Sequence, residues 1–540
     1  MKEKSQNMKG ILQRNSLILS LLVICVLTMC DLVTAKDAED FYPTGYSTQR
    51  YTYFRYLPRF DPSTPLDPNE MRITFLGSMI PPVRRAQQMM SIFVEVGNAK
   101  GEADQFVFDC GSGVSANYGA MGIGFDRMNK IFISHLHGDH MSDLSHIYCF
   151  GPPARQSPLF VFGPSASGKI YTEPADPVYN PNPKVYGPYE DGTKTYCEMI
   201  RAAMRWHSES FSFQNTSYAG YDPTVIKAQW GLPVDPVPVK DPRASYQGGE
   251  RFNEPDYVDS PNDGYALIPI ELDWTKYGEG FRPGSDTIRD NVAYENLKSG
   301  VKITHFPVIH AREASMGFKL EWNGLSMIYT GDTKPETHCL EQADNGGKGV
   351  DVFIHEMVVP PQIWAMKNAG EKVPPPFDNP GVQQLKTVQD SSHTPQGAFG
   401  YLLSQITPRP RLTVATHFPV ADDTVHCALK SVQAQCPDIK KLGKDVTWSF
   451  DLMVIRVTKD KIQQMRAVVS DYGFSPPVPT YSNENTPKYW TWAVDEDGNR
   501  ILDSNGNPMR VGDSFGQIDM KTSIPATEPD GTVNYREDGY

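Results

Sequence analysis

The sequence predicts an α/β fold that carries a long insertion and a C-terminal extension. Three observations support this class: apolar runs of strand length recur between turn residues, segments of helical length lie among them, and histidines and aspartates directly follow several apolar runs. Loops at strand ends are where such a scaffold usually places its chemistry. With 540 residues, the chain is long enough for one enlarged domain or for two domains.

The first strands are expected soon after an N-terminal extension over residues 36–70, which is rich in Tyr, Pro and Asp and has no clear period. Residues 151–300 are rich in Pro, Gly and Tyr, and a helix is expected only at Lys194–Arg205, so we interpret this segment as an insertion that covers the face carrying the site. The expected early strands are Met71–Leu76, Ser91–Val96, Gln105–Phe108 and Lys130–Ile133.

Strands are expected to resume after the insertion, and a helix near Pro395–Ser404 precedes the strand Leu412–Thr416. From about Ser475 turn signals replace apolar runs. The predicted organisation is therefore a main domain over residues 71–475 and a tail over residues 476–540, without internal repeats. The further expected strands are Val301–Thr304, Gly317–Trp322, Ser326–Tyr329, Val350–Ile354, Phe450–Val457 and Gln463–Val469.

The N-terminus has the features of a signal peptide. An apolar run from Ser16 to Cys30 follows a basic segment and precedes the small residues Val33-Thr-Ala35. The run is shorter than the ~20 residues of a spanning helix, which favours a cleaved signal over residues 1–35 against a membrane anchor. We expect export to the periplasm or the medium and no stable membrane span after cleavage.

Six cysteines remain after this cleavage, and they leave two alternatives open. An even number in an oxidising compartment permits disulfides, whereas buried free thiols explain the same residues equally well. The six are Cys110, Cys149, Cys197, Cys339, Cys427 and Cys436.

The charge of the chain bears on its substrate. The net charge is −13, and residues 151–300 contain 20 acidic and 14 basic residues. Such a surface repels a polyanion unless a local basic patch offsets it, and we find no Lys/Arg cluster of that kind. We therefore expect a small-molecule substrate and consider nucleic acid unlikely.

The run Ser134-His-Leu-His-Gly-Asp-His140 predicts a metal site. His135 and His137 alternate with an apolar residue, so an extended loop directs both imidazoles to one metal ion. Asp139 and His140 follow at the turn into a helix and can serve a second ion nearby. Imidazole and carboxylate ligands suit zinc, with manganese or iron as alternatives.

Three further residues that can bind metal each follow an apolar strand: His310, Asp332 and His417. Together with the first run they allow two divalent ions, each with three ligands of its own, and one shared carboxylate. We assign His135, His137 and His310 to one ion, Asp139, His140 and His417 to the other, and Asp332 to the bridge.

A series of motifs runs in order from residue 71 to about 470: Phe75-Leu-Gly77, Phe108-Asp-Cys-Gly111, Ile133–His140, Val308-Ile-His310, Tyr329–Thr333, Ile354-His-Glu356, Ser392-His-Thr394 and Thr416-His417. Together these motifs resemble those of ribonuclease Z and its relatives in the metallo-β-lactamase superfamily. Exported arylsulfatases of this branch are similar too, and the whole chain most resembles exported metallo-hydrolases labelled after guanitoxin biosynthesis. The resemblance implies a metallo-β-lactamase αββα sandwich.

The resemblance also implies roles for residues beyond the metal ligands. His393 resembles the proton donor to the leaving group, Glu356 the carboxylate that orients this histidine, and Asp109 a support for a metal-binding histidine. Asp139 is expected both to bind metal and to steer the nucleophile. The chain departs from the family pattern at Gly77-Ser-Met79, where relatives have Gly-Thr-Gly, and we find no counterpart of the basic arm that grips tRNA.

These residues predict an exported hydrolase that uses a hydroxide bridging two metal ions. Its expected substrates are phosphate or sulfate esters or a related small-molecule bond. The alternatives are a lactonase or amidase of the same fold and a ribonuclease Z-like phosphodiesterase. The oligomeric state and the role of the tail are not predicted.

Overall fold

The computed structural model covers the whole chain, and part of the chain has a defined placement. The described residues are 57–82, 84, 86–152, 157–171, 178, 181, 182, 184–205, 207, 208, 222–240, 265–277, 291–311, 313–371, 373–420, 422–439, 443–469 and 490–512. The expected signal peptide lies outside them.

Nine strands form the first sheet, in the order β1-β18-β17-β2-β3-β4-β5-β6-β9. The middle of the sheet is fully buried, since every residue of β2 and β3 lies out of solvent. From β4 to β9 all neighbours are parallel. The strands are β1 (Arg59–Phe60), β2 (Glu70–Gly77), β3 (Ser91–Gly97), β4 (Ala103–Phe108), β5 (Lys130–Phe132), β6 (Leu159–Pro164), β9 (Leu267–Leu272), β17 (Met453–Val457) and β18 (Ile462–Ala467).

Seven strands form the second sheet, in the order β10-β11-β12-β13-β14-β15-β16. Each pair of neighbouring strands from β10 to β13 is antiparallel, and each pair from β13 to β16 is parallel. The strands are β10 (Val292–Asn296), β11 (Val301–Pro307), β12 (Met316–Trp322), β13 (Leu325–Tyr329), β14 (Val352–Glu356), β15 (Leu412–Thr416) and β16 (Val446–Trp448).

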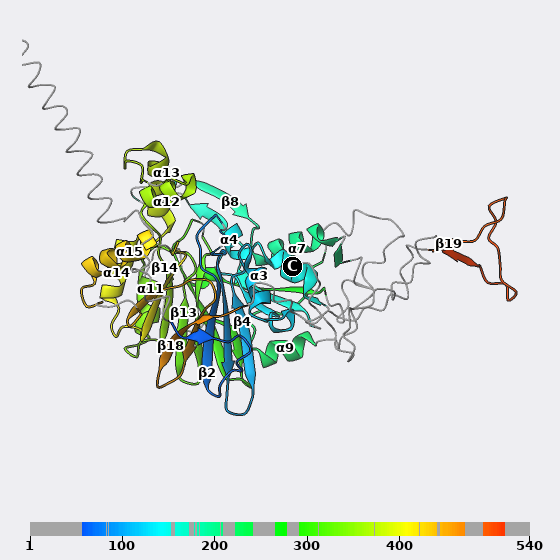
Figure 1. Cartoon of the computed structure of the whole chain (residues 1–540), viewed down its shortest axis with the longest axis horizontal. Coiled ribbons are helices and arrows are strands. Elements are labelled where there is room, and N and C mark those ends of the chain that lie inside the picture. Colours follow the sequence, from blue (N-terminus) through cyan, green and yellow to red (C-terminus); the bar gives the residue numbers. More distant parts are fainter. Residues whose placement is uncertain are drawn as a thin grey trace, which may run out of the picture. The chain divides into compact units, whose positions relative to one another are not determined.

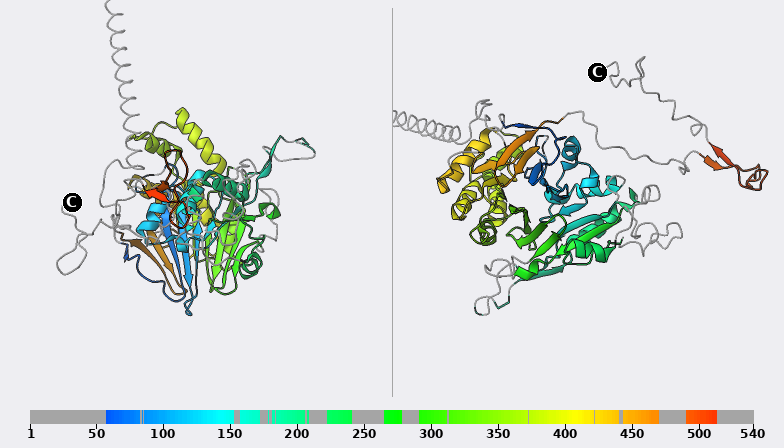
Figure 2. Two further views of the ribbon diagram at one scale, coloured as in Figure 1. Left: turned by 90° about the vertical axis from the view of Figure 1, so that its right-hand side faces the viewer. Right: turned by 90° about the horizontal axis from the view of Figure 1, so that it is seen from below.

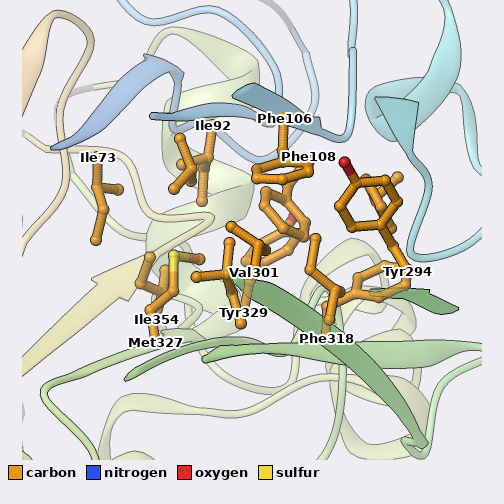
Figure 3. Packing of buried hydrophobic residues seen from close by; sticks show 14 of the residues in the cluster. Ile73, Ile92, Phe106, Phe108, Tyr294, Val301, Phe318, Met327, Tyr329 and Ile354 are labelled. Atoms are coloured by element: carbon orange, nitrogen blue, oxygen red, sulfur yellow. The ribbon is translucent and has the colours of Figure 1, made fainter. Parts of the chain in front are cut away.

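The two sheets pack face to face around one apolar core. Figure 2 shows the blue strands of the first sheet and the green strands of the second as adjoining layers. Between them Phe108 of β4 contacts Phe318 of β12 and Tyr329 of β13, with ring centroids 5.7 and 6.2 Å apart. Figure 3 shows these rings interleaved with aliphatic side chains from both layers. Burial of these side chains from water joins the sheets.

Helices cover both outer faces of this sandwich (Figure 1). Apolar residues of α3, α5 and α7 pack on the first sheet, and those of α11, α12, α14 and α15 pack on the second. The arrangement confirms the αββα sandwich that the sequence predicts. The helices are α3 (Val114–Ala120), α4 (Gly138–Met141), α5 (Leu144–Phe150), α7 (Thr193–Ala203), α9 (Pro223–Gln229), α11 (Thr337–Asp344), α12 (Pro361–Ala369), α13 (Pro380–Ser392), α14 (Gln396–Gln405) and α15 (Asp422–Gln435), with short 3₁₀ turns at Phe125–Arg127 and Trp274–Tyr277.

The segment predicted as an insertion, residues 151–300, contributes strands to both sheets. Its strands β6 and β9 pair with the first sheet, and β10 forms the edge of the second. These apolar strands lie between Pro- and Gly-rich stretches, which hid them from an analysis of composition. The part outside the two sheets lies mainly between β6 and β9, where β7 (Gly168–Tyr171) and β8 (Val185–Tyr189) pair as a separate hairpin.

The chain divides into two compact units, residues 1–478 and 479–540. In the second unit β19 (Trp490–Trp492) pairs with β20 (Arg510–Gly512). Two similar turns lie between these strands, because the carboxylates of Asp495 and Asp503 accept hydrogen bonds from backbone groups two and four residues later. This short repeat went unrecognised in the sequence.

None of the six cysteines of the described residues forms a disulfide, and all six are buried. Of the two alternatives that the sequence left open, the structure has the one without disulfides. None of the helices in the described ranges combines the length and apolar character needed to cross a bilayer.

Candidate metal centre

The candidate site lies where the strand ends of both sheets meet. Five strands end at this edge: the parallel pair β4 and β5 of the first sheet and the parallel strands β13, β14 and β15 of the second. Strand β11 ends there too, because it is antiparallel to β12, which is antiparallel to β13, so that β11 and β13 run in the same direction. The loops after these strands carry Asp109, His135, His137, Asp139, His140, His310, Asp332 and His417, and Glu356 is the last residue of β14.

The first group comprises His135, His137 and His310. Their ligand nitrogens lie within 4.8 Å of one another. The Nδ1 atom of His137 is 3.0 Å from Nε2 of His135 and 3.1 Å from Nε2 of His310. The structure thus brings together three histidines that are up to 175 positions apart in the sequence.

Hydrogen bonds behind the first group fix which nitrogens face inward as acceptors. Nδ1 of His310 lies 2.8 Å from the carbonyl oxygen of Ser392, which can only accept, so this nitrogen carries the proton and Nε2 keeps a lone pair. Ser134 donates its hydroxyl to Asp109 and therefore accepts from Nδ1 of His135 at 3.1 Å. Converging lone pairs repel one another, and a cation between them fits this donor set.

The second group comprises Asp139, His140, Asp332 and His417, whose ligand atoms also lie within 4.8 Å of one another. Nε2 of His140 is 3.4 Å from Asp139 and 3.2 Å from Oδ1 of Asp332. Nε2 of His417 is 3.1 Å from Asp139 and 3.4 Å from Oδ2 of Asp332. Two buried atoms in this group, Nε2 of His140 and Oδ1 of Asp332, have no hydrogen-bond partner in the described structure, as expected of atoms that bind a cation.

Asp332 lies between the two groups. Its Oδ1 faces His140, and its Oδ2 is 4.0 Å from Nε2 of His135 and 3.9 Å from Nε2 of His310. The side chain is almost fully buried. One carboxylate therefore faces the ligand atoms of both groups, which is the position that a bridging ligand requires.

The two groups differ in charge. Burial and neighbouring histidines hold the pKa of His135 well below its usual range and lower the pKa of His137 to about 4. Burial alone would also lower the pKa of His417, but Asp332 is the main group that raises it, to about 10. Burial alone would raise the pKa of Asp332, but His140 and His417 hold it well below its usual range. The first group is a set of neutral nitrogen donors, whereas the second pairs carboxylates with imidazoles.

Asp109 supports the second group from behind. Its Oδ2 accepts a 2.7 Å hydrogen bond from Nδ1 of His140 and a 2.5 Å hydrogen bond from the hydroxyl of Tyr329. Its Oδ1 accepts from the backbone N–H of Ser134 at 2.7 Å. Asp109 has a φ of 57°, a left-handed conformation that turns the chain at the end of β4. The carboxylate fixes the ring of His140 so that Nε2 points at the site.

His393 and Glu356 lie beside the two groups. Nδ1 of His393 is 2.9 Å from Oε2 of Glu356, and the other oxygen accepts from the backbone N–H of Thr333. Burial alone would lower the pKa of His393, but Glu356 raises it, while the same pair lowers the pKa of Glu356. Since Glu356 accepts the Nδ1 proton, Nε2 is the atom of His393 that can act on a substrate. His393, Glu356, His310 and Asp332 also form a third cluster of possible metal ligands.

Other residues noted in the sequence lie outside this arrangement. His146 is exposed on α5 and packs against Phe125 and Phe150. His355 is buried under the helices, with its ring near Phe353 and Phe399.

A small network connects the loop after β2 to the loop that carries His417 and was not predicted from the sequence. It consists of Gln87, Ser78 and Asp451. None of them forms a motif with the metal ligands, because their partners are mostly backbone groups distant in sequence. The departure from the family pattern at Gly77-Ser78-Met79, where Ser78 stands in place of the family threonine, was the only available signal.

No protein-family model matches the chain. The ribonuclease Z of Azobacteroides pseudotrichonymphae genomovar. CFP2 is 35% identical over 105 residues, 19% of this chain and 31% of that protein, so the chain spans about a third of this relative. The ribonuclease BN of Enterobacter sp. (strain 638) is 32% identical over 292 residues, 54% of this chain and 77% of that protein. Among solved structures, the metallo-β-lactamase fold protein YhfI from Bacillus subtilis has a TM-score of 0.37 at 11% identity, over 72% of this chain and 100% of YhfI.

These relatives correct the expectation that nucleic acid is an unlikely partner. Both curated relatives are ribonucleases. The expectation rested on the net charge of the whole chain, and net charge says little about the local surface that meets a substrate. The expected metallo-β-lactamase-fold hydrolase is confirmed at the level of the family: the chain, which covers 77% of the Enterobacter protein at 32% identity, belongs to the ribonuclease Z/BN branch of the metallo-β-lactamase superfamily.

Proposed function

We propose that the chain is a hydrolase that holds two divalent metal ions, with zinc as the expected metal and manganese or iron as alternatives. His135, His137 and His310 hold one ion, Asp139, His140 and His417 hold the other, and Asp332 bridges them. The proposal is supported by the converging lone pairs of the first group and by the unpartnered Nε2 and Oδ1 atoms of the second.

The residues of the chain divide the work of hydrolysis. When bound, two divalent ions supply Lewis acidity and lower the pKa of water enough for attack at neutral pH. Asp139 lies beside both His140 and His417, where its carboxylate can also orient the attacking water. Asp109, Ser134 and the carbonyl of Ser392 hold the ligand rings in place.

The pairing of His393 with Glu356 is the single observation that carries the reaction class. A histidine whose Nδ1 is held by a buried carboxylate, and whose pKa that carboxylate raises, can donate the Nε2 proton to a departing oxygen. Proton donation matters most for ester bonds with a poor alkoxide leaving group. We therefore propose phosphate esters as the main substrate class, with sulfate esters as a close alternative.

A second candidate is cleavage of RNA, which is a phosphodiester. It is favoured by the family, because both curated relatives are ribonucleases. The same residues would perform the same proton transfers on this substrate.

We also propose that residues 1–35 are removed on export to the periplasm or the medium, as the basic, apolar and small-residue segments indicate. Mass spectrometry of the native protein tests this. A mature chain that begins near Lys36 would support export, and an intact Met1 in the cytosol would overturn it.

The reaction is tested by a hydrolysis screen of protein loaded with zinc or manganese. The screen includes aryl and alkyl phosphodiesters, phosphomonoesters, aryl sulfates, lactones, acyl amides and a structured RNA with a 3′ single-stranded extension. We expect phosphodiester cleavage that chelation abolishes and the metal restores. Cleavage of lactones or amides alone would overturn the ester proposal, and cleavage of RNA without small esters would select the second candidate.

A further inference from the structure

His417 differs from His140 and His310 in how its ring is held. Nδ1 of His140 bonds Asp109, and Nδ1 of His310 bonds a carbonyl oxygen. Nδ1 of His417 is buried without a hydrogen-bond partner in the described structure, and the nearest carboxylate oxygen, that of Glu356, is 3.7 Å away. The position of this ring must therefore be set by its backbone.

The backbone at His417 is itself in an uncommon conformation. Its φ is 58°, in the left-handed region that residues with a side chain rarely adopt. Such a conformation costs of order 1–3 kcal/mol and persists only where surrounding contacts impose it. The contacts that impose it should lie on the residues next to His417.

Gln87 supplies these contacts. Its side-chain amide donates to the carbonyl oxygen of Phe418 at 3.1 Å, and its side-chain oxygen accepts from the backbone N–H of Val420 at 2.9 Å. Phe418 in turn donates its backbone N–H to the carbonyl oxygen of Ser78 at 3.1 Å. The side chain of Gln87 is buried, so water does not compete for these bonds.

Gln87 is in turn anchored to the first sheet. Its side-chain amide also donates to the hydroxyl of Ser78 at 2.9 Å, and this hydroxyl donates to Asp451 at 2.8 Å. Asp451 further accepts from the backbone N–H of Gln88 at 2.6 Å and from Asn117 at 2.9 Å. The chain of bonds connects the ends of β2 and β15, which belong to different sheets.

We propose that Gln87 is a positioning residue for the second metal ion, acting through the backbone of the loop that carries His417. It holds that loop at two points on the C-terminal side of the histidine and so fixes the direction of an imidazole whose Nδ1 has no hydrogen-bond partner in the described structure. No residue of the first group touches this network, so its effect is confined to the second ion. The inference rests on the proposed dinuclear site.

The test compares metal binding by Gln87→Met and Gln87→Glu with that of the wild-type protein. The methionine keeps the size and removes all three bonds, whereas the glutamate keeps the acceptor for Val420 and loses the donor for Phe418. Loss of a residue that orients a ligand typically weakens metal binding ~10–100-fold. We expect this loss for the second zinc ion in Gln87→Met, a smaller loss in Gln87→Glu, and unchanged binding of the first.

The sites are told apart by His417→Ala and His310→Ala, which mark loss of the second and of the first ion. Gln464→Met is the matched control, because the amide of Gln464 also donates to a backbone carbonyl, at 2.8 Å, but on β18. Thermal unfolding of the metal-free variants shows whether each one folds, and Gln87→Glu replaces Gln87→Met if the latter does not.

Weakening of both ions alike, or of neither, in a folded Gln87 variant would overturn the inference while the dinuclear proposal stands. A wild-type protein that binds fewer than two ions would overturn the proposed function, and the inference with it.

Discussion

The first and second ligand groups lie side by side but are built differently. The first has three neutral histidines, and two of them come from a single short loop after β5. The second has two carboxylates and two histidines, drawn from the loops after β5, β13 and β15. Converging neutral nitrogens repel one another more weakly than buried carboxylates do, and buried carboxylates need positive charge nearby. The comparison teaches that the second group depends more on positive charge, part of which His417 supplies, and on distant parts of the fold.

Asp332 is the residue on which the two groups converge, and its replacement should have the largest effect. Asp332→Ala removes the carboxylate that faces ligand atoms of both groups. We expect metal content to fall well below two equivalents and activity to disappear on every substrate. Elemental analysis and hydrolysis assays of the purified variant check this. Full activity with two bound ions would show that the groups work without a shared ligand.

Removal of one histidine from each group tests whether the two metal ions bind independently. His310→Ala should lose mainly the first ion, and His417→Ala mainly the second, so each variant should retain about one equivalent. In the metal-free state His310→Ala should be the milder change, because His417 balances the charge of Asp139 and Asp332. Elemental analysis and thermal unfolding measure the two effects. Equal loss of both ions in both variants would mean that the ions bind only as a pair.

Much of the candidate site could be predicted from sequence because its residues follow apolar strands. The run from His135 to His140 has a local pattern, and His310, Asp332 and His417 each come after a strand that the period reveals. The carboxyl ends of parallel strands meet at one edge, so residues far apart in the chain were expected to converge. The αββα layers were expected from the resemblance to a known family.

The rest could not be predicted, for identifiable reasons. The strands β6, β9 and β10 were missed because Pro- and Gly-rich composition dominated their surroundings. Gln87 was missed because two of its three side-chain hydrogen bonds go to backbone atoms more than 300 positions away, and such bonds leave no pattern in one sequence. The statement about nucleic acid failed because net charge was applied to a question of local surface.

Proton donation should be separable from metal binding. His393 lies outside both groups, so His393→Ala should keep two ions and still lose ~10²–10⁴-fold in rate, the usual contribution of a general acid. The loss should be greatest for alkoxide leaving groups and least for nitrophenolate, which departs without a proton. Glu356→Gln should show a weaker form of the same pattern. Rates for a series of phosphodiesters, with metal analysis of each variant, measure this.

An equal loss for good and poor leaving groups would remove His393 from this role. A loss of metal from His393→Ala would instead favour the third cluster, in which His393 is a ligand with His310, Asp332 and Glu356. The third cluster would then have to be counted as a metal-binding site beside the two groups.

The smallest expected effect concerns Asp451, which anchors the network beside the second group and touches no residue of the first. Burial raises the pKa of this carboxyl to about 7, although hydrogen bonds from Gln88, Ser78 and Asn117 oppose the shift. A carboxyl whose pKa is higher in the folded than in the unfolded state contributes stability below about pH 4, and this contribution is lost as the pH rises through about 7.

The free energy of unfolding of the metal-free wild-type protein, relative to that of Asp451→Asn, should therefore fall between about pH 4 and about pH 7. The fall should be about 1–2 kcal/mol, less than the full shift implies, because the group is partly exposed and solvent screens it. Urea unfolding of both proteins at several pH values measures it, and parallel curves would show that Asp451 stays ionised throughout.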